Sequence, residues 1–597
     1  MGALPLRAAE RRRGYGAVLV ALALFGLVWR HWCLRDVISL SKEPAIDWKP
    51  CWQDPEFLCG VLDVPTDHDD PSAGTIPIYL TKLPATKPER LGIVFTHPGG
   101  PGGSGVDASF VSARSIRNAT GGHHDIISFD QRGQGRARPN VNCFGSARAY
   151  YDFHSNTVFQ TTFSVPRDPF SDAGRAVLVE QQRQALALEE TQGAVCARTV
   201  GKEALGYMST TATVYDIEEI SRVLEGEDAL INFYSGSYGT VLGQYLVNML
   251  PHKTGRVYIS GNVPADMWAN VHYETQELLR LLLADAEKTY TFFLNECFEA
   301  GPKHCALSRQ TDTNAQSIKD RIDAFIDRLQ EQPLAVANST RPGYITSGAV
   351  RLTLFLAIQM PDYLPRFFTY IARAMDGDGA ELLRFVKRAY PPSDPETGPD
   401  EDGYVYIAQE NLSRLAISCG DALPRTEEEQ PPTAEEIVDA TLGTVRDVSP
   451  RFGATAHMIE QHGGCHYWPG TGVGPARYRG PWNNTLATRI LVASNLYDPI
   501  TPISAGTLVQ HTMGPANAHH LIQDAAGHST NAPNTQCAAQ VIRRYFVEGV
   551  LPEGSETRCA REQGNYFVHV VRERGVGAQL LGQEILRNDR LLLPLAS

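Results

Sequence analysis

Short runs of β-branched and aromatic residues alternate along the chain with longer stretches in which apolar residues recur every three or four positions. The short runs are bounded by turn residues and predict strands, whereas the longer stretches predict helices. Strands that alternate with helices favour an α/β fold with a mostly parallel sheet covered on both faces. The predicted strands are Leu91–His97, Asp125–Asp130, Leu230–Tyr234, Gly255–Ser260, Arg489–Ser494 and His519–Gln523, and the clearest helices are Ala173–Thr199, Val214–Leu224 and Tyr238–Met249.

This alternation stops after Ser260, because more than 200 residues pass before the next good strand pattern at Arg489. Apolar residues at helical spacing fill much of this gap, and charged, proline-rich connectors interrupt it. A large helical cap inserted into the core is the expected arrangement. The predicted divisions are a first core part at 45–262, the cap at 263–480, a second core part at 481–560 and a C-terminal extension at 561–597.

The N-terminus has the pattern of a targeting element. Arginines at positions 7 and 11–13 precede Gly14–Trp29, a run of sixteen residues without a charge that Arg30 closes. The run is slightly shorter than the ~20 residues of a comfortable bilayer span, yet no small-residue cleavage site follows it directly. We expect an uncleaved signal anchor at 14–32 with residues 1–13 in the cytosol. The alternative is a cleaved signal peptide and a secreted protein.

Charge and composition exclude some partners. The 597 residues include 67 acidic and 54 basic ones, a formal net charge of -13, and no basic stripe that would neutralise a phosphate backbone. Nucleic acid is therefore not an expected partner. No metal site and no cofactor are predicted either, because the adjacent histidines at 123–124 and 519–520 would face opposite ways on strands and no H-E-x-x-H motif occurs.

Cysteine usage points to an oxidising compartment. Eleven cysteines occur; Cys33 sits at the edge of the apolar run, and an even ten remain beyond it. Such a set indicates disulfides. The simplest pairings join Cys51 to Cys59 and Cys297 to Cys305, with several buried free thiols as the alternative. Sequons at 118, 338, 411 and 483 would permit glycosylation there.

The first candidate for chemistry is the segment Ser235-Gly236-Ser237-Tyr238-Gly239, which joins a predicted strand to a predicted helix. A nucleophile elbow needs this context and small residues around the serine, because the sharp turn brings the backbone against its neighbours. Ser235 departs from the G-x-S-x-G pattern, although it is still small. Ser237 is the predicted nucleophile, and on its own this motif is weakly specific.

A glycine-rich loop, His97–Gly105, follows the first predicted strand and holds five glycines in nine residues. Such a loop lets a backbone N–H point at a developing oxyanion, together with the N–H of the residue after the nucleophile. The predicted backbone donors are Gly99, Gly100 and Tyr238. A flexible surface turn or a phosphate-binding loop is the alternative, but the P-loop lysine and the G-x-G-x-x-G spacing are missing.

Two further candidates lie beyond the predicted cap, each in a loop after a strand. Asp498 follows Arg489–Ser494, and His528 follows His519–Gln523. The order Ser237, Asp498, His528 is the catalytic order of the α/β-hydrolase fold, and carboxyl ends of parallel strands are where ligands bind. We expect Asp498 to orient His528 and His528 to act as general base. Asp498 as a turn residue before Pro499, and His528 as a structural histidine, are the alternatives.

The turn after Asp125–Asp130 suggests a supporting element. Asp130 and Arg132 lie two residues apart in Asp130-Gln131-Arg132-Gly133-Gln134-Gly135. We expect them to form an ion pair that holds the glycine-rich loop without taking part in catalysis.

Taken together, these residues resemble the tripeptidyl aminopeptidase and proline iminopeptidase group of secreted α/β-hydrolases. The resemblance covers about residues 51–560 and departs from the group at Ser235, in place of glycine, and at Ala137, in place of a frequent serine. The matching segments are the loop His97–Gly105, the turn Asp130–Gly135, the elbow Ser237–Thr240, the acid loop Asp498–Pro502, the N-terminal Cys51 and Cys59–Pro65, and the C-terminal Cys537, Gly549, Pro552, Gly554 and Cys559.

The resemblance implies a serine exopeptidase that releases short peptides or single residues from peptide N-termini through an acyl-enzyme. A cap in this group admits chain ends and excludes folded proteins. An esterase or lipase for small acyl esters would use the same residues, and a membrane-tethered binding protein on a decayed scaffold is a third reading, which the intact Ser237, Asp498 and His528 disfavour. The expected partner is thus a small peptide or ester substrate; the sequence does not specify an oligomeric state.

Overall fold

A ten-stranded sheet forms the centre of the computed structural model, which describes Gly2 and residues 46–568 except 340, 388–409, 427, 461–463, 529–534 and 563. Its order is β1-β2-β3-β5-β4-β6-β7-β10-β11-β12; neighbours from β5 to β12 are parallel, and β1, β2 and β3 add antiparallel strands beside β5. The bounds are β1 Lys49–Pro50, β2 Leu58–Pro65, β3 Thr75–Leu83, β4 Ile93–His97, β5 Asp125–Phe129, β6 Ile231–Gly236, β7 Thr254–Ser260, β10 Ile490–Tyr497, β11 Ala518–Ala526 and β12 Glu556–Cys559.

All six predicted strands are present, as β4, β5, β6, β7, β10 and β11. They are buried on both faces, which is why their sequences read as continuous apolar runs. The sheet thus has the α/β-hydrolase fold that the sequence predicts. The other four strands of this sheet, β1, β2, β3 and β12, were not predicted. β2 and β3 alternate between buried and more exposed positions, so they lack a continuous apolar run.

Helices cover both faces of the sheet. Tyr234 and Tyr258 point to the face where α2 (Gly105–Ala119) and α20 (Gln536–Glu548) supply buried side chains. Their neighbours Phe233 and Ile259 point the other way, where they contact Gly243 of α8, since successive strand residues face opposite sides. This second face also carries α7 and α19. These helices span Thr210–Glu225 (α7), Tyr238–Met249 (α8) and Ile503–Met513 (α19).

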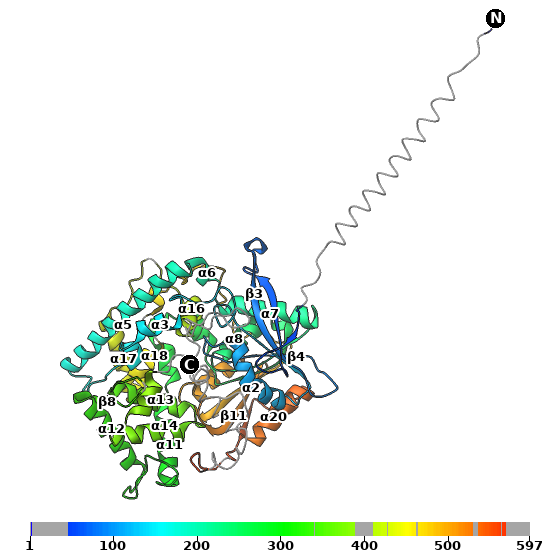
Figure 1. Ribbon diagram of the computed structural model, residues 1–597. Coiled ribbons are helices and arrows are strands. Elements are labelled where there is room, and N and C mark those ends of the chain that lie inside the picture. The colour runs from blue at the N-terminus through cyan, green and yellow to red at the C-terminus, as the bar shows by residue number, and fades with distance from the viewer. Residues whose placement is uncertain are drawn as a thin grey trace. The chain divides into compact units, whose positions relative to one another are not determined.

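The remaining helices gather on one side of the strands, where Figure 1 shows α5, α12, α13 and α17 together. Helix α5 (Asp172–Thr199) precedes β6 in the chain, yet it packs on α17 (Ala434–Asp447). Arg175 pairs with Asp439 across this contact at 2.7 Å, and apolar residues of both segments share a buried cluster. Helices from two separate stretches of sequence therefore build this layer.

The other bounds are α3 Ala147–His154, α4 Val158–Thr161, α6 Lys202–Gly206, α9 Ala265–Asn270, α10 Glu277–Leu282, α11 Ala286–Ala300, α12 Ala315–Glu331, α13 Ser347–Gln359, α14 Leu364–Met375, α15 Ala380–Lys387, α16 Glu410–Asp421 and α18 Gly453–Glu460. Short 3-10 helices lie at η1 Pro71–Ala73, η2 Pro251–Lys253, η3 Tyr273–Thr275 and η5 Gly464–Tyr467, and β8 Leu334–Val336 pairs with β9 Gly343–Ile345 in a separate two-stranded sheet.

All ten cysteines from Cys51 to Cys559 are paired, which agrees with an oxidising compartment. Both predicted pairings are present. Cys33 and the predicted anchor at 14–32 lie outside the described residues. Within the described ranges, no helix has the length and hydropathy needed to cross a membrane. The disulfides are Cys51–Cys59, Cys143–Cys196, Cys297–Cys305, Cys419–Cys465 and Cys537–Cys559.

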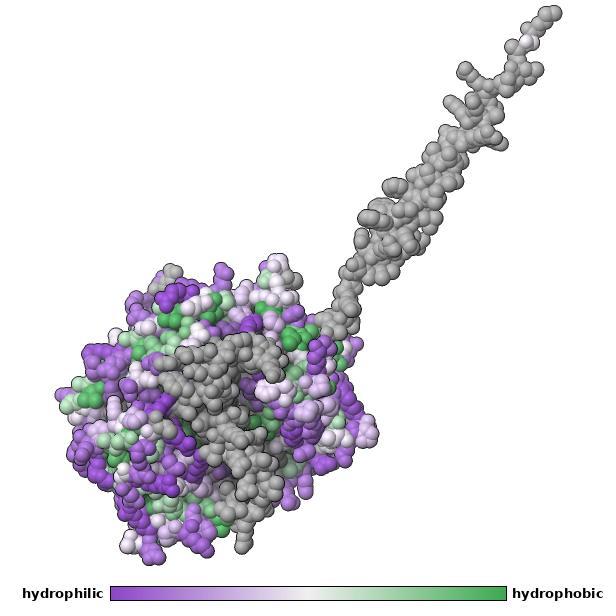
Figure 2. Space-filling view, viewed as in Figure 1, coloured by the Kyte–Doolittle hydropathy of each residue, from purple (hydrophilic) through white to green (hydrophobic). Residues whose placement is uncertain are grey.

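The surface is polar on the side seen in Figure 2. Hydrophilic residues dominate the described part of that view, and apolar residues form small areas between them. Large apolar side chains that are exposed include Trp52, Val61 and Phe170, which come from distant points of the chain. Scattered exposed apolar residues are ordinary in folded proteins.

Candidate active site

The carboxyl ends of four parallel strands bring the predicted residues to one edge of the sheet. His97 at the end of β4 lies opposite Ser235 of β6, and Tyr497 at the end of β10 pairs with Ala526 of β11. The chain runs from β4 to β5 on one side and later to β6 on the other, so the order of strands reverses between β4 and β6. Such a switch point opens a crevice at the carboxyl edge.

Ser237 occupies a strained turn between β6 and α8. Its backbone has φ 56° and ψ −132°, a conformation that residues other than glycine rarely adopt and that is found at functional sites. The residue is partly exposed while its neighbours are buried. Ser235 fits the turn by donating its hydroxyl proton to the His97 carbonyl at 2.6 Å. The serine in place of glycine thus adds a hydrogen bond between β6 and β4.

Gly99 lies against the predicted nucleophile. A methyl group on Gly99 would approach Cβ of Ser237 to 2.9 Å, and its φ is +97°, so glycine is required here. Its N–H, however, donates to Nδ1 of His97 at 3.1 Å. Burial lowers the pKa of His97 to about 4, which keeps the ring neutral and able to accept. Of the two predicted loop glycines, Gly100 is therefore the better candidate for an oxyanion donor.

Asp130 holds the other end of the glycine-rich loop. Its carboxylate accepts from the Ser104 hydroxyl at 2.6 Å, from the Val106 N–H at 3.0 Å and from the Arg136 N–H at 2.7 Å. Burial, with the Asp107 charge nearby, raises the pKa of Asp130 to about 6. Gln134 also contacts the glycine-rich loop. With its side-chain amide oriented so that both the oxygen and the nitrogen have partners, the oxygen accepts from the Gly102 N–H at 2.9 Å and the nitrogen donates to the Gly103 carbonyl at 2.7 Å.

The predicted ion pair between Asp130 and Arg132 was wrong. Arg132 instead donates to both carboxylate oxygens of Asp216 in α7, each at 2.7 Å, and both side chains are buried. His68 also contacts Asp216 at 2.9 Å. Burial alone raises the pKa of Asp216, but Arg132 and His68 outweigh burial and hold that pKa below its ordinary value. The planar guanidinium of Arg132 instead has a bidentate carboxylate partner on a packed helix, 84 residues along the chain.

Asp498 and His528 are brought together as predicted from their strand loops. Nδ1 of His528 lies 3.1 Å from Oδ2 and 3.2 Å from Oδ1 of Asp498. Asp498 is fully buried and also accepts from the N–H groups of Ile500 and Thr501 at 3.0 and 2.8 Å. A proton held on Nδ1 by this carboxylate leaves Nε2 as the basic nitrogen.

Thr501 supports both members of this pair, a role that the sequence analysis missed. Its hydroxyl donates to Oδ2 of Asp498 at 2.7 Å and lies 3.0 Å from Nδ1 of His528. The signal was available, because Thr501 belongs to the acid loop that carries the family resemblance.

Comparisons with known proteins agree with this geometry. Residues 449–559 match the family described as TAP-like protein. The serine protease Hip1 of Mycobacterium tuberculosis is 22% identical over 563 residues, 90% of this chain and 96% of that protein. The tripeptidyl aminopeptidase of Streptomyces coelicolor is 30% identical over 231 residues, 37% of this chain and 39% of that protein. Carboxylesterase B of M. tuberculosis is 25% identical over 507 residues, 84% of this chain and 86% of that protein.

The chain is a serine hydrolase of the α/β-hydrolase fold.

Cap helices reach the histidine loop of this hydrolase. The N–H of His528 donates to the carbonyl of Gln359, the last residue of α13, at 2.8 Å. A methyl group on Gly527 would lie 2.4 Å from Cδ of Pro361. From the core side, the Asn495 amide donates to the Gly527 carbonyl at 3.0 Å. The loop that carries His528 is thus fixed both by the sheet and by the turn between α13 and α14.

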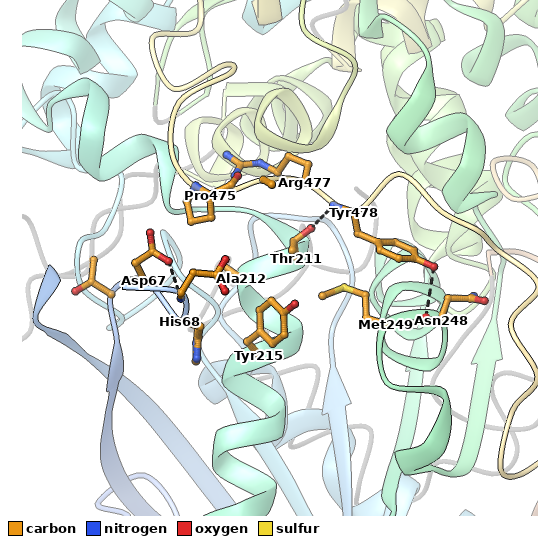
Figure 3. Close-up of a pocket in the computed structure, with 13 residues that line it drawn as sticks. Asp67, His68, Thr211, Ala212, Tyr215, Asn248, Met249, Pro475, Arg477 and Tyr478 are labelled. Carbon is orange, nitrogen blue, oxygen red and sulfur yellow. Dashed lines mark hydrogen bonds between the residues drawn. The ribbon is translucent and has the colours of Figure 1, made fainter. Parts of the chain in front are cut away.

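A separate cavity of about 370 Å³ shares no residue with the predicted catalytic set. Figure 3 shows Asp67 and His68 on one side of it, Met249 and Tyr478 on the other, and Tyr215 between them, next to His68. The N–H of Tyr478 donates to the Thr211 hydroxyl at 3.0 Å in its wall. The cavity therefore lies between the loop after β2, helices α7 and α8, and the segment that leads from the cap helices to β10.

Proposed function

We propose that this hydrolase is an exopeptidase that releases short peptides or residues from peptide N-termini through an acyl-enzyme on Ser237. The observation that carries the proposal is the buried Asp498–His528 pair at the same sheet edge as the strained Ser237 turn. The similarity of the chain to a serine protease and to a tripeptidyl aminopeptidase supports a peptide as the acyl donor.

In the first half-reaction, Nε2 of His528 takes the Ser237 proton while the hydroxyl oxygen attacks the peptide carbonyl carbon. The N–H groups of Gly100 and Tyr238 stabilise the resulting oxyanion. His528 then gives the proton to the leaving amine. In the second half-reaction, His528 takes a proton from water, whose oxygen attacks the ester carbon, and returns that proton to Ser237 as the product leaves. Asp498 remains ionised and stabilises the imidazolium.

Selection of chain ends would come from the cap. Residues 263–480 form its main part, and we infer that helices α3 to α6 complete it, because α5 packs on α17. The contact of Gln359 with His528 holds this layer close to the chemistry. Cap helices this close to the chemistry would exclude folded proteins and admit flexible ends, which favours exopeptidase action.

The proposed location is the far side of a membrane, with residues 1–13 in the cytosol and 14–32 as an uncleaved anchor. The apolar run and the five disulfides support this arrangement. Extraction of cell membranes with alkaline carbonate tests it: the anchored protein stays in the membrane pellet at its full-length mass, whereas a shortened protein in the medium would show signal cleavage.

The test of function is a panel of N-terminally free and N-blocked mono-, di- and tripeptidyl amides beside short-chain esters, with Ser237→Ala as control. We expect Ser237-dependent cleavage of the free peptides and poor cleavage of the blocked ones. Cleavage of esters alone would instead establish the esterase function, for which the 25% identity to carboxylesterase B is the supporting observation. Full activity of Ser237→Ala would overturn both.

A further inference from the structure

The side chain of Tyr238 is fully buried directly behind the predicted nucleophile. Tyr238 is the first residue of α8, and its N–H is a proposed oxyanion donor. Its ring packs between the rings of His97 and Trp268, each at 5.5 Å between centroids. Its hydroxyl lies 2.5 Å from Oγ1 of Thr210 and accepts from the Gln131 amide at 3.0 Å. Contacts that position this phenol therefore also position the residue that directly follows Ser237.

A carboxylate from the cap lies at the end of this contact. Asp421 is the last residue of α16, and it is fully buried. It accepts from the N–H of Thr210 at 2.9 Å, from the Thr210 hydroxyl at 2.5 Å and from the Trp268 indole N–H at 3.0 Å. All three donors are neutral. Burial raises the pKa of Asp421, although these donors and the nearby Arg477 oppose the rise.

The backbone around Asp421 is held independently of its carboxylate. Arg479 donates to the Asp421 carbonyl at 2.7 Å, and Arg477 donates to the Gly420 carbonyl at 2.8 Å. The disulfide between Cys419 and Cys465 fixes the same turn of α16. A packing role alone would not need a charge here, since burying a carboxylate among neutral donors is costly.

The proton directions along this chain follow from the groups present. An ionised carboxylate only accepts, so the single hydroxyl proton of Thr210 goes to Asp421. The Thr210 oxygen must then accept the proton of the Tyr238 hydroxyl, whose own lone pair accepts from Gln131. The charge at Asp421 thus sets one direction for three successive hydrogen bonds, from Gln131 through Tyr238 and Thr210 into the cap.

We propose that Asp421 is a positioning residue of the active site, whose negative charge orients Tyr238 through Thr210 and so fixes the Tyr238 N–H toward the oxyanion. The inference rests on the proposed function, and it connects the cap to the oxyanion donors as well as to His528. In the variant Asp421→Asn, a neutral amide replaces the charge, so the chain has no fixed direction and the first turn of α8 loses one restraint.

The experiment measures the rate at which a fluorophosphonate labels Ser237 in the full-length protein, with kcat and KM on the best substrate of the panel. Labelling needs only the nucleophile, its base His528 and the oxyanion donors, so the result does not depend on the peptide preference. We expect Asp421→Asn, Thr210→Val and Tyr238→Phe each to lower the labelling rate and kcat about tenfold with KM within about twofold. The double variant Thr210→Val/Tyr238→Phe should lose no more than either single one, because both break one chain.

The matched control is Thr213→Val. Thr213 is also fully buried in α7. Its hydroxyl donates to the Ser209 carbonyl at 2.9 Å and takes no part in the hydrogen bonds that link Gln131, Tyr238, Thr210 and Asp421. We expect it to label at the wild-type rate. Wild-type labelling by Asp421→Asn, or additive losses in the double variant, would overturn the proposal.

If Asp421→Asn does not fold, the labelling rates of Tyr238→Phe, of Thr210→Val and of their double variant decide between the same outcomes. Failure of every peptide in the panel, with normal labelling, would count against the proposed function alone.

Discussion

The two halves of the active site are built in different ways. The acid–base half joins Asp498, Thr501 and His528, which come from two adjacent strand loops and lie within 30 residues of one another. The oxyanion half joins the loop after β4 to Gln131, Tyr238 and Asp421, through contacts between residues that are 107 and 211 positions apart. A local half depends on strand pairing, whereas a distributed half depends on how the cap and core pack. Substitutions in each half should therefore have different effects on kcat and on stability.

The largest effect is expected for Asp498→Asn in the acid–base half. The amide no longer favours the proton on Nδ1 of His528, so Nε2 loses its role as base, and kcat should fall by about 10³–10⁴-fold. Initial rates at saturating substrate measure this. The thermal unfolding curve should show a folded protein, and a loss below tenfold would mean that Asp498 does not orient the histidine.

The next effect falls on the oxyanion half, in Gly100→Ala. Gly100 has φ +103°, and a methyl group there would lie 2.9 Å from the Gly102 nitrogen, so the loop must shift and its N–H must move. We expect a loss of about 10²-fold in kcat. Gly514→Ala is the control, because φ is +82° and a methyl group would meet nothing within 4 Å there. Equal losses in the two variants would assign the effect to backbone strain and not to the oxyanion.

Asp130 gives the oxyanion half a dependence of stability on pH. Its folded pKa of about 6 is above the ordinary 3.8, so the folded state binds this proton more tightly than the unfolded state does. The resulting stability is complete below pH 3.8 and is lost as pH rises through 6, which amounts to about 3 kcal/mol. Denaturant unfolding of wild type and Asp130→Asn from about pH 4 to 8 tests this. The stability of wild type should fall more steeply, and parallel curves would contradict the shift.

The smallest effect is expected for Thr501→Val. The variant keeps the shape and removes the hydroxyl that contacts both Asp498 and His528. Two backbone N–H groups still hold Asp498, so kcat should fall only about tenfold. Thr501→Ser restores the hydroxyl and should recover most of the rate. Without that recovery, the loss would reflect packing.

Local patterns carried most of the fold prediction. Six strands were predicted because they are buried on both faces and read as continuous apolar runs. β3 was missed although Ile76, Ile78 and Leu80 alternate with less buried neighbours, a signal that half-covered strands give weakly. The packing of α5 on α17 was not visible, because a helical period says which face is apolar and not which partner covers it.

For the site, as for the fold, the sequence predicted the residues that lie in local motifs. Ser237, Asp498 and His528 stand in motifs that each need only a strand and a turn. The partner of Arg132 was assigned to a neighbour two residues away, whereas Asp216 lies 84 residues along the chain. Thr210 and Asp421 belong to no motif, and only tertiary packing brings them to Tyr238. Sequence reasoning therefore finds groups that act through local turns and misses those that act through buried chains.

The contact between α5 and α17 also sets an order on biosynthesis. α5 ends at Thr199 and α17 begins at Ala434, so the first helix leaves the ribosome before its partner has been made. At about 5–20 residues per second, the intervening segment takes on the order of 10–50 s to synthesise. During that interval the apolar face of α5, with Leu178, Val179 and Ala185, lacks the part of its buried cluster that α17 supplies. The buried cluster on α5 is complete only after both α17 and α18 have been made.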